Sequence, residues 1–187
     1  ELRHVRHDLR YARERDADWI VITHRDLEPA ARRLAEHRRA SGLAAEVVII
    51  DDIYDEFSWG RPNNWAVRNF LNYAADFWGA PAYLTLLGDA TYDYLNYAGN
   101  NAGAYVPTHL VVAETMITAS DAWFGASGDE GLNPFLAVGR LPAKDLDEAA
   151  RMVDRVIAYE NSGSGHAWQG RMVNVASDEN GGIFKAG

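Results

Sequence analysis

Short apolar runs without polar alternation mark the strands that the sequence predicts. Leu43 to Ile50 is predicted to be a further strand, and Trp19 to Thr23 and Tyr83 to Leu87 are runs of this kind. They are typical of strands buried on both faces of a parallel sheet, because helices cover both sides and no position must face water. Further strands are predicted from Pro134 to Arg140 and from Arg171 to Ser177. We expect Tyr83 to Leu87 to be the central strand.

Helices are predicted between these strands. Apolar residues recur at helical spacing from Leu27 to Ala40, and again in a helix that Arg61-Pro62 opens and Gly79 ends. A later helix is expected from about Asp145 to Tyr159, whereas the aromatic and acidic stretch from Ile53 to Gly60 is predicted to be a loop. Alternating strands and helices with right-handed crossovers favour a three-layer α/β fold with a mostly parallel sheet.

Periodicity is lost after Asp89. The Tyr- and Asn-rich stretch up to Gly103 is predicted to be a long loop, and such loops in compact domains tend to be functional. Ala104 to Val112 is expected to form one or two short strands, with Pro107 restricting them to an edge or a bend. The stretch from Ser120 to Gly131 is rich in turn-forming and acidic residues.

Composition and charge narrow the classes of function. The 187 residues carry a net charge of −9, which argues against nucleic acid as a partner, because such binding depends on clustered Lys and Arg. There is no cysteine, which removes disulfides, thiolate metal sites and a Cys nucleophile from these residues. No apolar run is long enough to suggest a membrane span. Residues 1–18 are predicted to be a linker, and a start as charged as theirs is typical of a cut inside a longer protein.

Carboxylates follow several predicted strands, and parallel strands would bring them to one edge of the sheet. These residues are Asp51, Asp52, Asp89 and Asp178. Together with Asp121 and Asp129 in the turn-rich stretch, they suggest an oxygen-rich site for Ca²⁺, for which Asp89, Asp121 and Asp129 are the candidate ligands. The more common use of Asp at such positions is to cap turns and helix starts.

Arg140 closes a predicted strand in a Gly-Arg-Leu-Pro context. Held there, its guanidinium is suited to clamp a carboxylate, either that of a substrate or, as the more common use, that of Asp89 or Asp121. The six histidines are scattered, and none belongs to a zinc-binding His-Glu-x-x-His pattern. The sequence also lacks the nucleophile elbow, the Walker loop and the dinucleotide fingerprint, which weakens hydrolase, NTPase and dinucleotide-binding interpretations of those kinds.

Several stretches, taken in their order and spacing, resemble the catalytic region of the gingipain family of cysteine peptidases. The stretches are Trp19-Ile-Val-Ile-Thr23, Asp52-Ile-Tyr-Asp-Glu-Phe-Ser-Trp-Gly60, Tyr83-Leu-Thr-Leu-Leu-Gly-Asp89, Ser120-Asp-Ala-Trp-Phe-Gly125, Val138-Gly-Arg-Leu-Pro-Ala143, and Val156-Ile-Ala-Tyr-Glu160 followed by Trp168. The resemblance implies a caspase-like α/β fold with a first subdomain in residues 19–118 and the beginning of a second, catalytic subdomain in residues 119–187. It also implies a secreted, bacterial-type enzyme that cleaves protein or peptide substrates and binds structural calcium.

The departures from the family pattern bear on the chemistry. In that family the catalytic His lies in a Gly-His-Gly context after a later strand, and the nucleophilic Cys follows the next strand. Neither feature occurs here, so we expect His and Cys after Gly187, no catalytic residue in this chain, and no activity of the chain alone. Two alternatives stay open: a calcium- or sugar-binding α/β module, and a peptidase relative that has lost the dyad and serves secretion.

Overall fold

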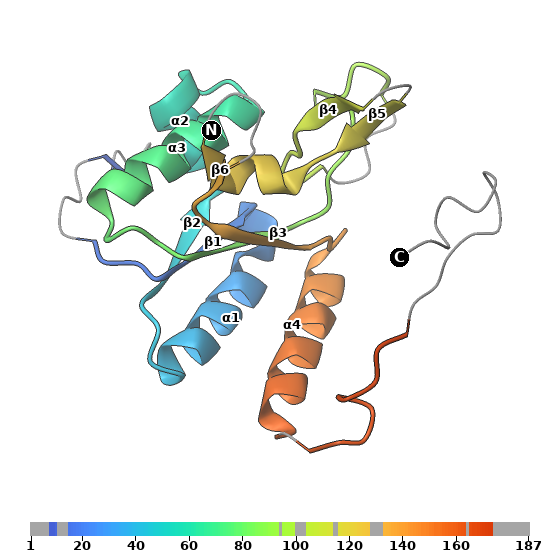
Figure 1. The fold of residues 1–187 in the computed structure, drawn as a ribbon. Helices are drawn as coiled ribbons and strands as arrows, with labels where there is room; N and C mark the ends of the chain where they lie inside the picture. Colours follow the sequence, from blue (N-terminus) through green and yellow to red (C-terminus); the bar gives the residue numbers. More distant parts are fainter. Residues whose placement is uncertain are drawn as a thin grey trace. The chain divides into compact units, whose positions relative to one another are not determined.

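A computed structural model describes residues 8–10, 15–93, 95–99, 104–113, 116–127, 133–163 and 165–173. Its main sheet has four strands in the order β2-β1-β3-β8 (Figure 1). These are β1 (Trp19–Thr23), β2 (Ala45–Ile49), β3 (Tyr83–Leu87) and β8 (Ala137–Leu141). All three pairings are parallel, and β3 pairs with β1 on one side and β8 on the other. The prediction of a parallel sheet with Tyr83–Leu87 inside it is confirmed.

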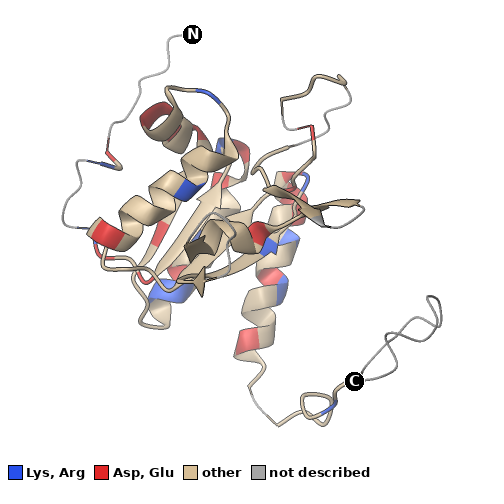
Figure 2. Ribbon diagram, turned by 45° about the horizontal axis from the view of Figure 1, so that its top comes forward, with Lys and Arg blue, Asp and Glu red and all other residues tan. Residues whose placement is uncertain are grey.

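Helices cover both faces of this sheet. They are α2 (Ile50–Ser58) and α3 (Asn64–Phe77) on one face, and α1 (Glu28–Ala40) and α4 (Leu146–Asn161) on the other. Alternation along β1 explains the two cores, since Ile20 and Ile22 join the cluster beneath α2 and α3 while Val21 joins the cluster beneath α1 and α4. Figure 2 shows the charged residues mainly on helices and connecting segments. The predicted three-layer α/β architecture is therefore confirmed.

Residues 50–58 correct the sequence-based prediction. The stretch from Ile53 to Gly60 was expected to be a loop, but α2 is helical and buries Ile50, Ile53 and Tyr54. Apolar residues at this spacing line one face of a helix, and that periodicity outweighs the aromatic and acidic composition. The following helix also begins later than the predicted start at Arg61-Pro62. Its N-cap is Asn63, whose side-chain oxygen accepts a hydrogen bond from the backbone N–H of Trp65 at 2.9 Å.

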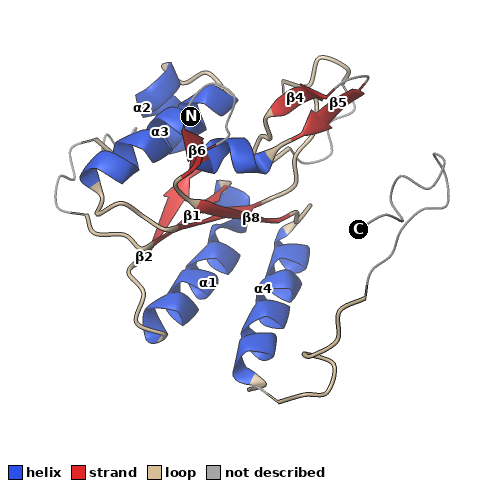
Figure 3. Ribbon diagram, in the orientation of Figure 1, coloured by secondary structure: helices blue, strands red, loops and turns tan. Residues whose placement is uncertain are grey.

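Small elements connect β3 to β8. An antiparallel ribbon is formed by β4 (Leu110–Ala113) and β5 (Met116–Ala119), and Figure 3 draws it apart from the main sheet. A second, shorter ribbon pairs β6 (Ala126–Ser127) with β7 (Asn133–Pro134). The 3₁₀ helices are η1 (Arg25–Leu27) after β1 and η2 (Asp121–Gly125) in the stretch predicted to be turn-rich. Among the strands expected in residues 104–112, β4 forms at the later end.

The chain divides into two compact units, Glu1–Ile157 and Ala158–Gly187. The first unit contains the whole main sheet, whose strands lie on both sides of residue 118, so the expected subdomain boundary there stays a prediction for the complete protein. In the second unit, residues 171–173 are not in a strand, and the rest of the strand predicted up to Ser177 lies outside the described residues. Among the described helices, none combines the length and the apolar character that crossing a membrane requires.

Candidate functional site at the carboxyl edge of the sheet

The four parallel strands end in line, which makes their carboxyl edge the first place to look for a site. Thr23 lies opposite Ile49 on one side and Leu87 on the other, and Leu87 lies opposite Leu141. The chain leaves β1 toward β2 and later returns to place β3 on the other side of β1. Sheets of this kind bind ligands in the crevice at such a reversal point, beyond the strand ends.

In this protein the crevice between the ends of β1 and β3 is filled by the chain itself. The backbone N–H groups of Tyr105 and Val106 donate to the carbonyl of Asp89 at 3.0 and 3.3 Å, and the Val106 side chain is fully buried. Gly88 has φ +142°, and a Cβ there would lie 2.7 Å from the Cβ of Tyr105. Residues 105–107, which return to this edge, are called the returning segment. Glycine is needed at Gly88 both for its backbone conformation and for the close approach of this segment.

Arg140 fixes the returning segment in place. Its Nε and Nη2 donate to the two carboxylate oxygens of Asp121 at 2.6 and 2.8 Å. Nη1 donates to the carbonyls of Gly88 and Val106 at 2.8 and 2.9 Å, and Nη2 also donates to the carbonyl of Pro107 at 3.0 Å. All five N–H donors of a guanidinium are thus used within the protein. We call this set of contacts the Arg140 clamp.

Asp121 receives two kinds of partner. Burial by itself raises the pKa of its carboxyl, but the hydrogen bond and charge of Arg140 and the hydrogen bond from Thr108 outweigh burial and hold the pKa below its ordinary value of 3.8. The Thr108 hydroxyl donates to Oδ1 at 2.8 Å. Asp121 is therefore the ionised half of an internal ion pair, and Arg140 binds this carboxylate in the way that the sequence favoured over a substrate clamp.

The two candidate calcium ligands that the structure describes, Asp89 and Asp121, both accept hydrogen bonds from groups of the protein. Oδ1 of Asp89 accepts from the N–H of Ala90 at 2.9 Å, and the oxygens of Asp121 already accept from Arg140 and Thr108. Asp129 lies outside the described residues. Within the part of the chain that the structure describes, no group of three His, Asp or Glu side chains is placed to hold a metal ion. The calcium site stays a prediction.

Two of the strand-end carboxylates belong to a helix start, and one cannot be placed. Asp51 and Asp52 lie in the first turn of α2, where the helix dipole favours negative charge, and Asp52 pairs with Arg25 at 3.8 Å. Neither residue caps the helix, because the N-cap position of α2 is Ile49 and carries no side-chain cap hydrogen bond. Asp178 lies outside the described residues.

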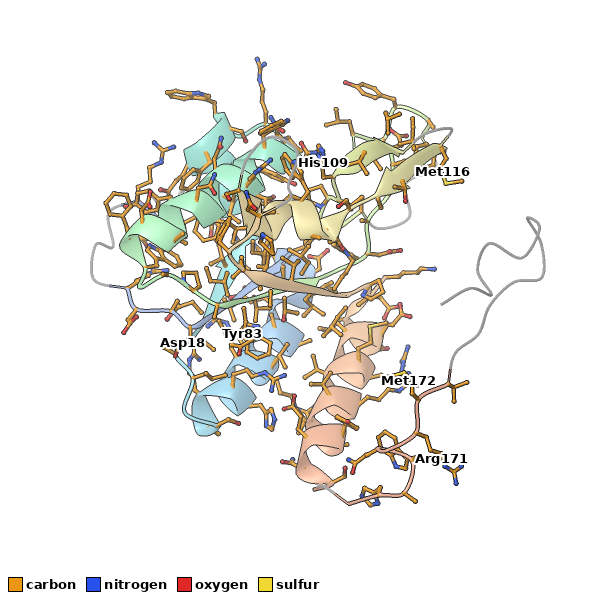
Figure 4. The ribbon with its side chains drawn as sticks, in the orientation of Figure 1. Asp18, Tyr83, His109, Met116, Arg171 and Met172 are labelled. Atoms are coloured by element: carbon orange, nitrogen blue, oxygen red, sulfur yellow. The ribbon has the colours of Figure 1, made fainter. Side chains whose placement is uncertain are left out.

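Two histidines near the site have structural surroundings. Nδ1 of His24 accepts from the backbone N–H of Asp26 at 3.2 Å, which caps η1. His109 lies on the side of the sheet covered by α3 (Figure 4), stacked on Trp123 with ring centroids 3.7 Å apart and 3.0 Å from the Asn64 amide nitrogen. Burial and the nearby charge of Arg68 lower the pKa of His109 from 6.5, so the ring is neutral at pH 7.

A pocket lies on the opposite side of the sheet from this histidine. It has a volume of about 120 Å³, and its lining residues are Trp19, Leu34, Arg38, Thr85, Gly139, Arg140, Leu141 and Val156. The guanidinium of Arg38 lies 4.0 Å from the ring of Trp19, whose indole N–H donates to Thr85 at 3.0 Å. None of the lining residues is an acid, a histidine or a cysteine, so the pocket offers no general base that could activate its hydroxyl group, that of Thr85, as a nucleophile.

Three residues in polar contacts were missed by the sequence analysis. Thr108 was not connected with Asp121, and Arg68, which stacks over Trp123 at 4.1 Å, lay within a helix and drew no prediction. Glu56, which binds two backbone N–H groups of the N-terminal segment, was assigned to a loop. For Glu56 a signal existed, because the helical spacing of Ile50, Ile53 and Tyr54 already indicates α2. The partners of Thr108 and Arg68 left no local signal.

Comparisons with known proteins agree with the fold. The sequence model of peptidase family C25 matches residues 12–186. The crystal structure of dimeric latent PorU from Porphyromonas gingivalis is similar with a TM-score of 0.71 and 29% sequence identity, covering 88% of this chain and 18% of that chain. A solved structure described as a protease, 16% identical, shares the fold with a TM-score of 0.54 over 80% of this chain and 33% of that chain. No curated protein matches.

Proposed function

Because this chain belongs to peptidase family C25, the gingipain family of cysteine peptidases, we propose that it is the scaffold portion of a cysteine endopeptidase whose thiol lies outside residues 1–187. The observation that carries the proposal is the family match over residues 12–186, supported by the structural similarity to PorU over 88% of the chain. The chain spans 18% of the PorU chain, so a catalytic centre elsewhere in a longer protein is compatible with this match.

The residues of the chain itself support a scaffold role. There is no cysteine among them, and a cysteine peptidase attacks the peptide carbonyl with a thiolate. The Asp26 carboxylate lies 3.4 Å from Nδ1 of His24, but this nitrogen accepts the backbone N–H of Asp26 and so caps a 3₁₀ helix. His109 is packed against Trp123 and bonded to Asn64, and so lacks the open face that a general base needs. The carboxyl edge is filled by residues 105–107 and fixed by Arg140. The chain thus supplies a rigid sheet on which a neighbouring catalytic part can be held.

We further propose that the complete enzyme is secreted or displayed on the cell surface and acts on protein or peptide substrates. The resemblance to the gingipains supports this, and the substrate class follows from the peptidase family. In the full enzyme, a His-assisted thiolate would attack the peptide carbonyl, with backbone N–H groups binding the oxyanion. None of these groups is assigned to a residue of this chain.

The test uses the product of the complete gene beside the 187-residue chain. Each is incubated with casein and with a thiol-directed peptide probe, before and after limited trypsin treatment to remove any inhibitory segment. We expect hydrolysis by the complete product that iodoacetamide abolishes, with the probe attached to a cysteine outside residues 1–187, and neither activity nor labelling of the short chain. Hydrolysis by the short chain, iodoacetamide-resistant hydrolysis, or a complete product that neither cleaves casein nor takes up the probe in either condition would overturn the proposal.

A further inference from the structure

A short stretch ahead of the first strand is bound to the outer helices of the fold. The described residues Asp8, Leu9 and Arg10 lie in the part of the chain expected to be a linker, yet Leu9 is only 5% exposed and belongs to the core cluster beneath α2 and α3. The carboxylate of Glu56 accepts from two consecutive backbone N–H groups, that of Leu9 at 2.8 Å and that of Arg10 at 3.0 Å.

Arg10 makes two further contacts with α2 and α3. Its guanidinium carbon lies 4.5 Å from the ring centroid of Phe57, and its backbone carbonyl accepts a hydrogen bond from the Tyr73 hydroxyl at 2.6 Å. Two N–H groups, one carbonyl, the apolar side chain and the cation are therefore all engaged. Leu9 and Arg10 lie in a turn. Main-chain hydrogen bonds that give affinity, combined with side-chain sites that give specificity, are a common way for proteins to bind peptide segments.

The binding surface is formed by packing that does not depend on the bound segment. Phe57 makes edge contacts with Phe70 and Tyr73 at centroid distances of 5.7 and 5.9 Å, which fixes both rings between α2 and α3. Glu56 lies in α2, next to Phe57. Rings held by contacts with one another, in addition to those with the bound segment, lose less entropy on binding.

We propose that Glu56, Phe57 and Tyr73 form a peptide-docking site on α2 and α3, whose ligand is a short turn with an apolar residue followed by arginine. Leu9-Arg10 of the same chain occupies this site. The site selects arginine over lysine, because a planar guanidinium stacks on an aromatic ring better than an ammonium does. A peptide of the same chemistry competes for the same surface.

In the unaltered chain, the tethered Leu9-Arg10 segment competes with any free peptide for the site, so binding of the free peptide is weak. A tethered segment acts at an effective concentration of about millimolar, so a free peptide must overcome that concentration before it binds. Weakening the tethered segment should therefore make binding of a free peptide measurable. Replacement of the two side chains in the double variant Leu9→Ser with Arg10→Ser, called the emptied chain, removes the apolar and cationic contacts, while Glu56, Phe57 and Tyr73 are left in place.

The experiment measures fluorescence anisotropy of a labelled peptide that copies residues 5–13. We expect saturable binding to the emptied chain that is at least about tenfold tighter than to the unaltered chain, as tethered competition requires. Adding Glu56→Gln to the emptied chain should weaken binding by about tenfold, because one of the two accepting oxygens becomes an NH2 group that cannot accept and the remaining hydrogen bond loses its charge. Glu36→Gln, an exposed carboxylate of α1, is the matched control and should change nothing, and a scrambled peptide should not bind.

Equal peptide binding by the emptied and unaltered chains, or equal weakening by Glu56→Gln and Glu36→Gln, would refute the docking site. Circular dichroism establishes that each variant is folded. If the emptied chain does not fold, hydrogen exchange in the otherwise unaltered chain decides. Glu56→Gln should then speed exchange of the Leu9 and Arg10 amides by about tenfold and Glu36→Gln should not. Unchanged exchange at these two amides would overturn the proposal.

Discussion

Replacing Arg140 by methionine removes the guanidinium while keeping a long apolar side chain in the same space. The five hydrogen bonds of the Arg140 clamp would be lost together. Asp121 would keep the bond from Thr108 but lose its counter-charge, and the carbonyls of Gly88, Val106 and Pro107 would each lose a donor. The lost hydrogen bonds all lie where residues 105–107 pack against the carboxyl edge of the sheet.

The expected loss follows from burial. The Arg140 side chain is 12% exposed and that of Asp121 is 26% exposed, so water replaces the lost partners only in part. Breaking a fully buried pair from one side destabilises a protein by about 3–5 kcal/mol, and the partial exposure of Asp121 places this case near the lower end, at about 3 kcal/mol. For a chain of this size, about 3 kcal/mol corresponds to a fall in Tm of roughly 6–12 °C.

The assay is thermal and urea unfolding followed by circular dichroism and tryptophan fluorescence. The matched control is Arg33→Met, because Arg33 in α1 also pairs with an aspartate, Asp154 in α4, but the two side chains are 54% and 52% exposed. Pairs exposed to that degree contribute about 0–1 kcal/mol, so the control should lower Tm by no more than about 2–4 °C.

Asp121 gives a second, independent check. A double-mutant cycle of Arg140→Met with Asp121→Asn should give a coupling energy of at least about 1 kcal/mol, as expected for residues in direct contact. Because the folded-state pKa of Asp121 lies below 3.8, the contribution of the carboxylate is present above that pH and is lost as the pH falls through the folded-state value. A loss below about 1 kcal/mol for Arg140→Met, or additive effects in the cycle, would refute the idea that the clamp fixes this edge.

Three further changes test other parts of the structure by the same unfolding measurements. Gly88→Ala should destabilise the protein by about 2–4 kcal/mol, because the backbone there is strained for alanine and the new Cβ would lie 2.7 Å from Tyr105. In the control Gly139→Ala, in β8, the new Cβ meets no atom within 4 Å, so stability should change by less than about 1 kcal/mol. Equal effects of the two changes would contradict the steric argument. His109→Gln should flatten the decline in stability between pH 7.5 and 5.5, because the lowered pKa makes protonation favour the unfolded chain, while His166→Gln should keep the decline. Asn63→Ala should cost about 1 kcal/mol through loss of the α3 N-cap, and no loss would show that the cap contributes nothing.

The strands and most helices could be predicted because their signals are local. Continuous apolar runs mark β1 and β3, and helical spacing marks α1 and α4, each within a window of about 15 residues. The helix α2 carried the same kind of signal in Ile50, Ile53 and Tyr54. The aromatic and acidic residues of this stretch, which are also typical of loops, obscure the helical spacing.

The candidate site could be predicted only in part. That Arg140 would pair with a carboxylate follows from its residue type, but the choice of Asp121 over Asp89 depends on η2 approaching β8, which no local pattern reveals. The filling of the edge by residues 105–107 depends equally on a long return of the chain. For Leu9 and Arg10, a charged and aperiodic context hides a contact made 46 or more residues away.

The Arg140 clamp also bears on the order in which the protein folds. Its partners lie 19, 33, 34 and 52 residues away in sequence, so the guanidinium cannot be satisfied until η2, the returning segment and the end of β3 have all reached β8. Because each of these closures costs entropy, we expect the clamp to form after the rate-limiting barrier, in which case its loss accelerates unfolding more than it slows folding. We therefore expect the clamp to lower the rate at which this edge of the sheet unfolds.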